Sequence, residues 1–409
     1  MVGSTLDESI PMVPRIRQVQ IQNYKSIERA VIDLEPFTVF VGANGSGKSN
    51  FVDALAFVQE CLNQSVKWAF DRRGGFTIVN RGCKEPASIG FRFLIDLSEE
   101  SSADYSFTIH AEDFHVRVTH EHCTVLGEGG KESGFETSEG RFLREIPGVR
   151  SKLLPDRLAL FAASAVEEFR PLYEFLTLVR PFSIDPNRLR GQQRLESGEV
   201  LQQDGGNAAS VLNHLLLSSQ ETYGQICRLL GSLIPGIEKI EVLTDAAGRE
   251  GTIAFQQNIG EETTSFLASE MSDGTLRALG LLLALHQPQH PTVILVEEPE
   301  ATIHPAMIEL VVQVLVGASW NCQILVTTHS PEILDAEEIQ DDQIRVVTLE
   351  NGKTVIAPLS KASRQAVREN LYTPGELLRI DELHQDLEAA LEASENLDIS
   401  GKGPRVTPA

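Results

Sequence analysis

The stretch from Phe37 to Asn50, FTVFVGANGSGKSN, joins a short apolar run to a glycine-rich turn and the start of a helix. It contains the pattern G-x-x-x-x-G-K-[ST], which is matched by Gly42, Gly47, Lys48 and Ser49. Glycines let backbone amides approach a phosphate closely, and the positive end of the following helix attracts the anion. The stretch therefore predicts a strand, a phosphate-binding loop and a helix, in that order.

The same loop predicts how a nucleotide is held. The Lys48 ammonium can reach the β- and γ-phosphates, and the Ser49 hydroxyl can be one ligand of a Mg²⁺ ion that bridges them. The residues expected to bind the nucleotide from this loop are Gly42, Asn44, Gly45, Gly47, Lys48 and Ser49.

The composition is that of an ordinary globular protein. Of the 409 residues, 42% are hydrophobic and 23% are charged, and no apolar run approaches the roughly 18 residues that span a bilayer. Residues 1–14 lack a signal-like apolar segment, so we expect a flexible lead and a cytoplasmic location. The net charge of −23 argues against broad nonspecific binding to DNA or anionic lipid.

The first half of the chain predicts strands around the helix that follows the phosphate loop. Alternating apolar and polar residues predict strands at 16–21, 30–34, 89–97, 105–111 and 114–125, the last three in an antiparallel sheet. The polar, glycine-rich segment Gly127–Gly140 predicts an exposed loop. From Ala159 to Leu233 the pattern is helical, but prolines and glycines divide it into short helices, which argues against coiled-coil arms.

The second half predicts strands that alternate with helices, which is the order of a parallel sheet. The expected strands are 237–243, 252–256, 292–296 and 323–326, with helices through Leu276–Leu285 and from Pro305. A hairpin with its turn at Asn351 and Gly352 follows, then an acidic helix near 382–391 and a frayed end over the last ten residues.

Two apolar strands end in residues suited to ATP chemistry. VILVEEPE, at Val293–Glu300, supplies Glu297 to hold the shell of a metal ion and Glu298 to handle an attacking water. QILVTTHSP places His329 at the corresponding end of the next strand, the edge where parallel sheets bind ligands. We expect His329 to donate a hydrogen bond to a γ-phosphate.

The motifs GANGSGKS, MSDGTLRAL, ILVEEPEATIHP and LVTTHSP occur in the order that is seen in ATP-binding-cassette-type ATPases. The chain resembles the RecF/SMC-like and OLD-like branch of these P-loop ATPases. The resemblance implies ATP and Mg²⁺ as cofactors. It also implies that Ser272 and Gly274 form a signature that contacts the γ-phosphate bound by another subunit, and that Ala301–His304 crosses the dimer interface. The residues alone equally predict Ser272 as a helix N-cap.

The sequence departs from the family pattern in two places. Glu297 stands where the wider family usually has Asp, so its carboxylate reaches one methylene further. The glutamine that normally senses Mg²⁺ and the attacking water has no evident counterpart, and Asn80 and Arg81 are weak candidates for that role.

These observations predict an α/β P-loop NTPase with an ABC-type ATPase core, an antiparallel β subdomain and a helical insertion. The expected parts are a lead (1–14), an N-terminal ATPase lobe (15–158), the helical insertion (159–236), a C-terminal ATPase lobe (237–360) and an acidic helical tail (361–409).

Three functions are compatible with this ATPase. The first is an ATP-dependent homodimer that acts as the switch of a RecF-like DNA-maintenance system, with DNA as a candidate partner. The second is the ATPase of a phage-defence or toxin-type system, acting with a separate effector such as a nuclease. A transporter subunit is the weakest, because about 225 residues separate the phosphate loop from the signature. Arginines near 141–157 and 188–194 could contact phosphates, although solvated surface is the simpler explanation.

Overall fold

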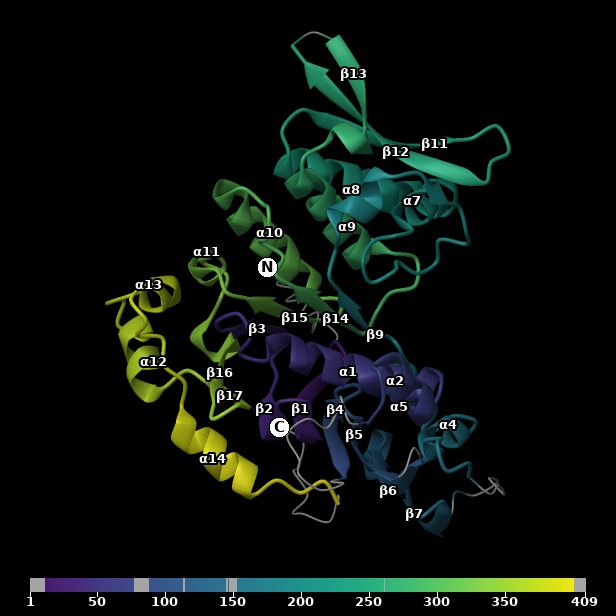
Figure 1. The fold of residues 1–409 in the computed structure, drawn as a ribbon, viewed down its shortest axis with the longest axis vertical. Helices are drawn as coiled ribbons and strands as arrows, with labels where there is room; N and C mark the ends of the chain where they lie inside the picture. The colour runs from purple at the N-terminus through teal and green to yellow at the C-terminus, as the bar shows by residue number, and fades with distance from the viewer. Residues whose placement is uncertain are drawn as a thin grey trace, which may run out of the picture.

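The computed structural model describes residues 12–76, 88–112, 115–144, 146, 153–260 and 262–400. These residues form three β-sheets with helices between and around them (Figure 1). Residues 1–11 of the predicted lead and 401–409 of the predicted frayed end lie outside the described residues. Within the described part, no helix is long and apolar enough to cross a membrane.

The central sheet has six strands, and their order confirms the predicted α/β class. They run β17 (Lys353–Pro358), β16 (Ile344–Glu350), β3 (Phe37–Val41), β15 (Gln323–Thr328), β14 (Val293–Glu297) and β9 (Val179–Phe182). The last five of these are parallel to their neighbours, and β17 pairs antiparallel with β16. The strand of the phosphate loop, β3, therefore lies between strands from the far end of the chain.

Both faces of this sheet are covered, which explains why its strands are apolar throughout. On β14, Ile294 and Val296 belong to one hydrophobic cluster, whereas Val293 and Leu295 belong to another on the opposite face. The alternation follows from the two-residue period of a strand. Burial on both faces is typical of parallel sheets.

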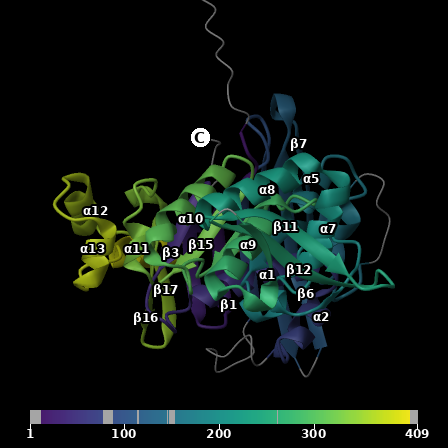
Figure 2. The ribbon, with the colours of Figure 1, turned by 90° about the horizontal axis from the view of Figure 1, so that it is seen from above.

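Helices separate the sheets into layers (Figures 1 and 2). Between the central and antiparallel sheets lie α1 (Lys48–Asn63), α2 (Val66–Arg72) and α5 (Arg170–Thr177), with α4 (Ala159–Ala163) nearby. The other face of the central sheet carries α7 (Ala208–Ser218), α8 (Gln220–Leu233), α9 (Asp273–His286) and α10 (Pro305–Ala318).

The antiparallel sheet is larger than the sequence predicts. Its order is β2 (Ile27–Asp33), β1 (Arg15–Tyr24), β4 (Ile89–Asp96), β5 (Ser102–Glu112), β6 (His115–Leu126), β7 (Glu132–Ser138) and β8 (Arg141–Arg144). The predicted exposed loop at Gly127–Gly140 is wrong, because it holds the short helix η1 (Glu128–Gly130) and strand β7, which pairs with β6. Phe135 anchors β7, with its side chain fully buried against Phe169.

The third sheet lies beyond α7, α8 and α9 (Figure 1). It contains β10 (Gln193–Arg194), β12 (Glu250–Ile259), β11 (Ile237–Thr244) and the mostly exposed β13 (Glu262–Leu267), which the sequence did not predict. The range expected to be a helical insertion, 159–236, also contains β9, an edge strand of the central sheet, and α6 (Pro186–Arg190).

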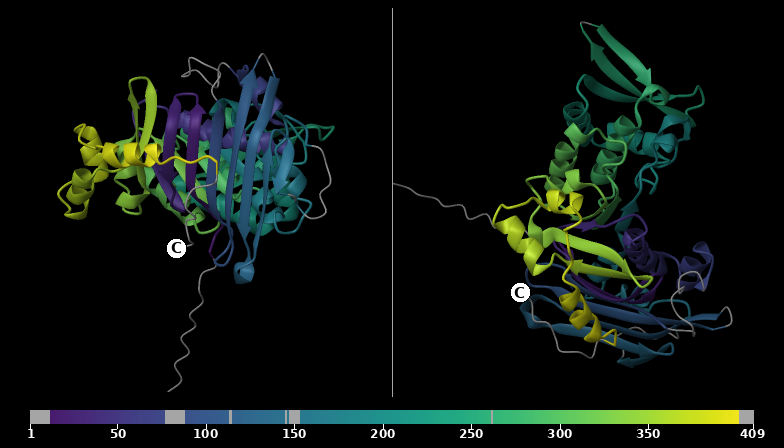
Figure 3. Two further views of the ribbon diagram at one scale, coloured as in Figure 1. Left: turned by 90° about the horizontal axis from the view of Figure 1, so that it is seen from below. Right: turned by 60° about the vertical axis from the view of Figure 1, so that its left-hand side comes forward.

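The C-terminal part folds back over the other sheets. Its elements are α11 (Pro331–Leu334), η3 (Asp341–Gln343), α12 (Lys361–Arg368), α13 (Pro374–Arg379) and α14 (Leu387–Glu395), whereas the short helix η2 (Ala268–Glu270) precedes α9 and contacts β12. Helix α14 lies beside β2 (Figure 3). Beyond it, Ile399 packs on Gly90, and Arg92 donates to the carbonyl oxygen of Asp398 at 2.9 Å. The end of the described chain therefore crosses the outer face of the antiparallel sheet.

We predict that Phe135→Ala lowers the free energy of unfolding by about 3–5 kcal/mol, because it leaves a cavity in a fully buried site. Chemical denaturation monitored by circular dichroism measures the change. Leu143→Ala on β8 is the control, because that side chain is 64% exposed. Equal stabilities of the two variants would mean that β7 does not belong to the core.

Candidate active site

Three neighbouring strands end at the same edge of the central sheet. In the parallel register, Val41 of β3 pairs with Thr328 of β15, and Glu297 of β14 pairs with Thr327. The phosphate loop, the acidic turn after β14 and the His329 turn therefore begin side by side. The carboxyl edge of a parallel sheet is where such folds bind ligands.

The phosphate loop is open to solvent at its tip and tightly held at its base. Gly45 and Gly47 have φ angles of +81° and +108°, which only glycine adopts without strain. Asn44 is exposed at the tip. At the base, the Lys48 Nζ atom donates to the carbonyl oxygens of Gly42 at 2.6 Å and Ala43 at 3.1 Å. Burial lowers the pKa of Lys48, an effect that nearby carboxylates oppose.

The hairpin of β16 and β17 supports this loop from behind. A Cβ atom at Gly42 would lie 2.1 Å from the carbonyl oxygen of Val347, and one at Gly47 would lie 1.9 Å from Thr354 Oγ1. The Thr354 hydroxyl donates to the carbonyl oxygen of Ser46 at 2.8 Å. Close packing therefore requires glycine at both positions, in addition to the room that a phosphate would need.

Ser49 and Glu297, which the sequence predicts to hold a metal ion, lie close together. They hydrogen-bond to each other and line a cavity of about 360 Å³. Burial raises the pKa of Glu297, and the hydrogen bond from Ser49 opposes that rise. A hydroxyl and a carboxylate are hard oxygen ligands of the kind that Mg²⁺ prefers, so the residues present fit this ion.

Glu298 and His329 meet above the sheet edge. The His329 Nδ1 atom lies 3.3 Å from Glu298 Oε1, and both side chains are partly exposed. Glu298 has a φ of +45°, which is rare for a residue with a side chain and is typical of functional sites. The structure thus brings together the two residues that the sequence predicts to be catalytic.

The predicted signature residues lie at the start of α9. Ser272 is the N-cap, and its hydroxyl accepts from the Thr275 amide at 3.2 Å, as the N-cap interpretation predicts. Gly274 packs against the turn after β14, where an added Cβ would lie 2.8 Å from the carbonyl oxygen of Thr302. Ser272 and Asp273 are exposed, so this helix end is accessible from outside the molecule.

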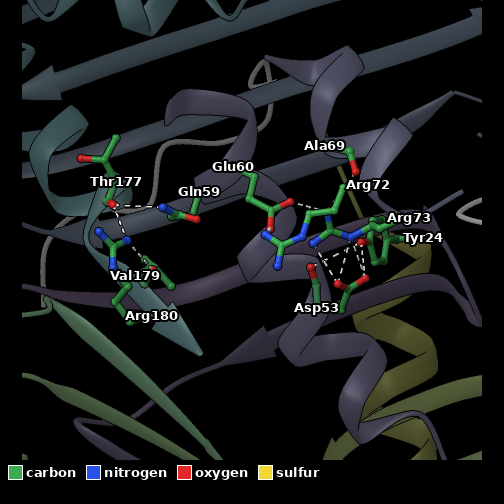
Figure 4. A network of polar contacts seen from close by, with 10 residues as sticks. All are labelled: Tyr24, Asp53, Gln59, Glu60, Ala69, Arg72, Arg73, Thr177, Val179 and Arg180. Atoms are coloured by element: carbon green, nitrogen blue, oxygen red, sulfur yellow. Dashed lines mark hydrogen bonds and ion pairs between the residues drawn. The ribbon is translucent and has the colours of Figure 1, made fainter. Parts of the chain in front are cut away.

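A dense ion-pair network, which sequence reasoning missed, lies along α1 (Figure 4). Asp53 accepts from Tyr24 Oη at 2.6 Å and Arg73 Nε at 2.9 Å, and Lys25 Nζ lies 2.6 Å from its carboxylate. Arg73 also binds Glu60. The network ties the β1–β2 turn and the end of α2 to α1. The same cavity is lined by Lys25, Arg72 and Arg73, each of which is paired with a carboxylate.

Gln203 is the glutamine that lines this cavity, together with Ser49 and Glu297. Its carbonyl oxygen accepts from the Ser183 amide, just after β9, at 2.9 Å. No motif surrounds Gln203, and it is far from Ser49 in sequence, so no sequence signal pointed to it. The weak candidates Asn80 and Arg81 lie outside the described residues.

Three of the arginines considered for phosphate contacts are paired with acids. Arg188 lies 2.7 Å from Asp204, and Arg190 pairs with Asp273. Arg144 lies 3.5 Å from Glu132. Such pairing favours the interpretation of these arginines as structural or solvated surface.

Comparison with known proteins agrees with this geometry. The family model described as "AAA domain, putative AbiEii toxin, Type IV TA system" matches residues 37–335. The chain is 23% identical to the Old nuclease of Escherichia phage P2 over 370 residues, which cover 83% of this chain and 60% of that protein. A 44-residue segment is 46% identical to the chromosome partition protein Smc of Methanocaldococcus jannaschii, covering 10% of this chain and 4% of that protein.

Solved structures show the same fold. An SMC head bound to the C-winged helix domain of ScpA has a TM-score of 0.50 and 15% identity, and the match covers 85% of this chain and 98% of that one. An Smc head with an extended coiled coil, bound to the C-terminal domain of ScpA derived from Pyrococcus furiosus, has the same TM-score and identity and covers 88% and 100%. The fold is that of a P-loop ATPase of the ABC, SMC and OLD type, which confirms the expected family.

We predict that Lys48→Ala weakens ATP binding by on the order of a hundredfold, because it removes the charged hydrogen bonds to phosphate oxygens. Equilibrium binding of labelled ATP measures the loss. The control is Lys67→Ala, since Lys67 is exposed on α2 and pairs with Asp71. Unchanged affinity in a folded Lys48→Ala protein would exclude this loop from the nucleotide site.

Proposed function

The chain belongs to the AAA domain family that is described as putative AbiEii toxin, Type IV TA system, and from that premise we propose that it binds ATP with Mg²⁺ and hydrolyses it. The observation that carries the proposal is the shared sheet edge. There, the ends of β3, β14 and β15 present the phosphate loop, two carboxylates and a histidine to one site.

In this proposal the phosphate loop holds the nucleotide. Its backbone amides and Lys48 bind the phosphates, and Asn44 and Gly45 at the exposed tip lie along them. Ser49 and Glu297 hold Mg²⁺, directly or through its water shell. When bound, the ion neutralises charge on the β- and γ-phosphate oxygens. Lys25, which is paired with Asp53, lines the cavity on the same side.

Glu298 is the proposed general base. Its carboxylate is partly exposed, so it can reach a water molecule, and it lies 3.3 Å from His329 Nδ1. A hydrogen bond from His329 orients the carboxylate, and the other ring nitrogen is then available to the terminal phosphate. Because the left-handed backbone at Glu298 directs this side chain out of the strand, Glu297 and Glu298 can serve different roles although they are adjacent.

We further propose that ATP joins two copies of the chain head to tail. Ser272 and Gly274, at the exposed start of α9, would complete the partner's site, since a helix N-terminus attracts an anion. The neighbouring segment Ala301–His304 packs on Gly274 and would lie at the same interface. The family resemblance supports this arrangement.

The relatives favour a defence or toxin-type role for this switch. The family description names a putative toxin, and the Old nuclease is the relative that aligns over most of this chain. The chain spans about 60% of that nuclease's length. By analogy with this relative, we propose that ATP binding and hydrolysis by the chain control an effector such as a nuclease. The likeness to SMC heads concerns the fold, and DNA maintenance is therefore the second candidate.

Glu298→Gln should lower ATP turnover by on the order of a hundredfold or more while ATP still binds, because the amide keeps the shape but cannot accept a proton from water. Phosphate release under single-turnover conditions measures the step. Glu309→Gln, on the exposed side of α10, is the control. A native rate in Glu298→Gln would assign the base to another group.

Mg-ATP should convert the Glu298→Gln protein from monomer to dimer, because the ATP-bound form persists in that variant. Sedimentation with and without Mg-ATP gives the mass directly. Adding Ser272→Arg should abolish the association, whereas Ser218→Arg, exposed at the end of α7, should not. A mass that is insensitive to ATP would contradict the composite site.

A further inference from the structure

Arg277 on α9 and Glu300 in the turn after β14 carry opposite charges and lie near the place where these two elements pack together. Each has a buried polar atom that finds no hydrogen-bond partner among the described residues: Nε of Arg277 and Oε2 of Glu300. The other oxygen of Glu300 is engaged, since it accepts from the Thr328 hydroxyl at 2.6 Å and lies 3.4 Å from the His329 amide. Glu300 is thus bonded to the His329 turn on one side and open on the other.

Arg277 is placed to fill the open side. It lies three residues after Gly274, and therefore on the same side of α9, which packs against Thr302. The carboxylates that act on its guanidinium come from three elements: Asp185 after β9, Asp273 on α9 itself, and Glu298 and Glu300 after β14. Arg277 is therefore the cation on α9 that faces the acidic turn of the active site.

Leaving both groups unpaired is costly. A buried donor or acceptor without a partner loses its hydration and gains nothing in return, and the penalty is larger for charged groups. A small movement of α9 toward the sheet edge would remove both penalties at once. A guanidinium suits this role because it stays charged when buried and donates in a fixed planar geometry.

We propose that Arg277 is a positioning residue, whose guanidinium donates to Glu300 Oε2 in the ATP-bound, associated form and so fixes α9 to the turns that carry Glu298 and His329. Ser272 and Gly274, at the start of α9, are then oriented by the occupancy of the chain's own site before they meet the partner. This inference rests on the proposed ATP-dependent association and adds the contact that links the two halves of the site.

The test is a double-mutant cycle in the Glu298→Gln background. Arg277→Gln and Glu300→Gln should each weaken Mg-ATP-dependent association by about tenfold or more, the effect of losing one charged hydrogen bond. Their combination should be no weaker than the worse single variant. Equilibrium affinity for ATP should stay within about twofold. Arg188→Gln, which removes an exposed arginine paired with Asp204, should associate normally.

Hydrogen exchange of the α9 amides provides a second readout that does not need association. Mg-ATP should slow exchange at the start of α9 in the native protein at concentrations where it is monomeric, but not in Arg277→Gln. The inference would be overturned if the losses of association caused by Arg277→Gln and Glu300→Gln were additive. It would also be overturned if Mg-ATP protected the α9 amides equally in the native and Arg277→Gln proteins. If the Glu298→Gln protein does not associate but α9 protection still depends on Arg277, the proposed dimer fails and the Arg277 contact stands.

Discussion

The parallel register of β3, β15 and β14 is the constraint on which the candidate active site depends. Each of these strands is buried on both faces, so a slip of one residue would exchange the side chains of two different hydrophobic clusters. The register is therefore fixed by packing along the whole strand. As a consequence, the phosphate loop, Glu298 and His329 are positioned by the sheet, and the turns that carry them can be short.

A second layer of residues, behind the sheet edge, supports the phosphate loop and the helix that follows it. Val347 and Thr354 press against the two glycines that flank the phosphate loop, and the ion-pair network of Asp53 and Arg73 holds α1 to its neighbours. These contacts come from parts of the chain that are distant in sequence. They support the loop from behind, and Lys48 is bonded to the carbonyl oxygens of Gly42 and Ala43 within it.

Features that depend on a continuous stretch of sequence could be predicted, whereas features that depend on contacts between distant residues could not. The segments predicted to form the phosphate loop, the acidic turn and the His329 turn lie in continuous motifs, and in the structure they follow β3, β14 and β15. The predicted hairpin with Asn351 and Gly352 at its turn is also present. Strand β7 was missed because its glycine-rich, polar composition hides the single buried Phe135, and β13 because it is mostly exposed. Strand β9 was also missed, because it is only four residues long, contains a proline and lies between two helical segments. Gln203, Thr354 and Glu300 acquire their positions only through tertiary packing, which no local pattern records.

The placement of β3 also determines when the protein can complete its fold during synthesis. The neighbours of β3 in the sheet, β15 and β16, begin about 280 and 300 residues after it. At 5–20 residues per second, the strand waits roughly 15 to 60 s on the ribosome before either can pair with it. During that interval the phosphate loop stands at the end of an unpaired apolar strand, which is a template for aggregation. Nascent chains of this protein therefore need either a chaperone or early packing of β3 on α1 and the antiparallel sheet.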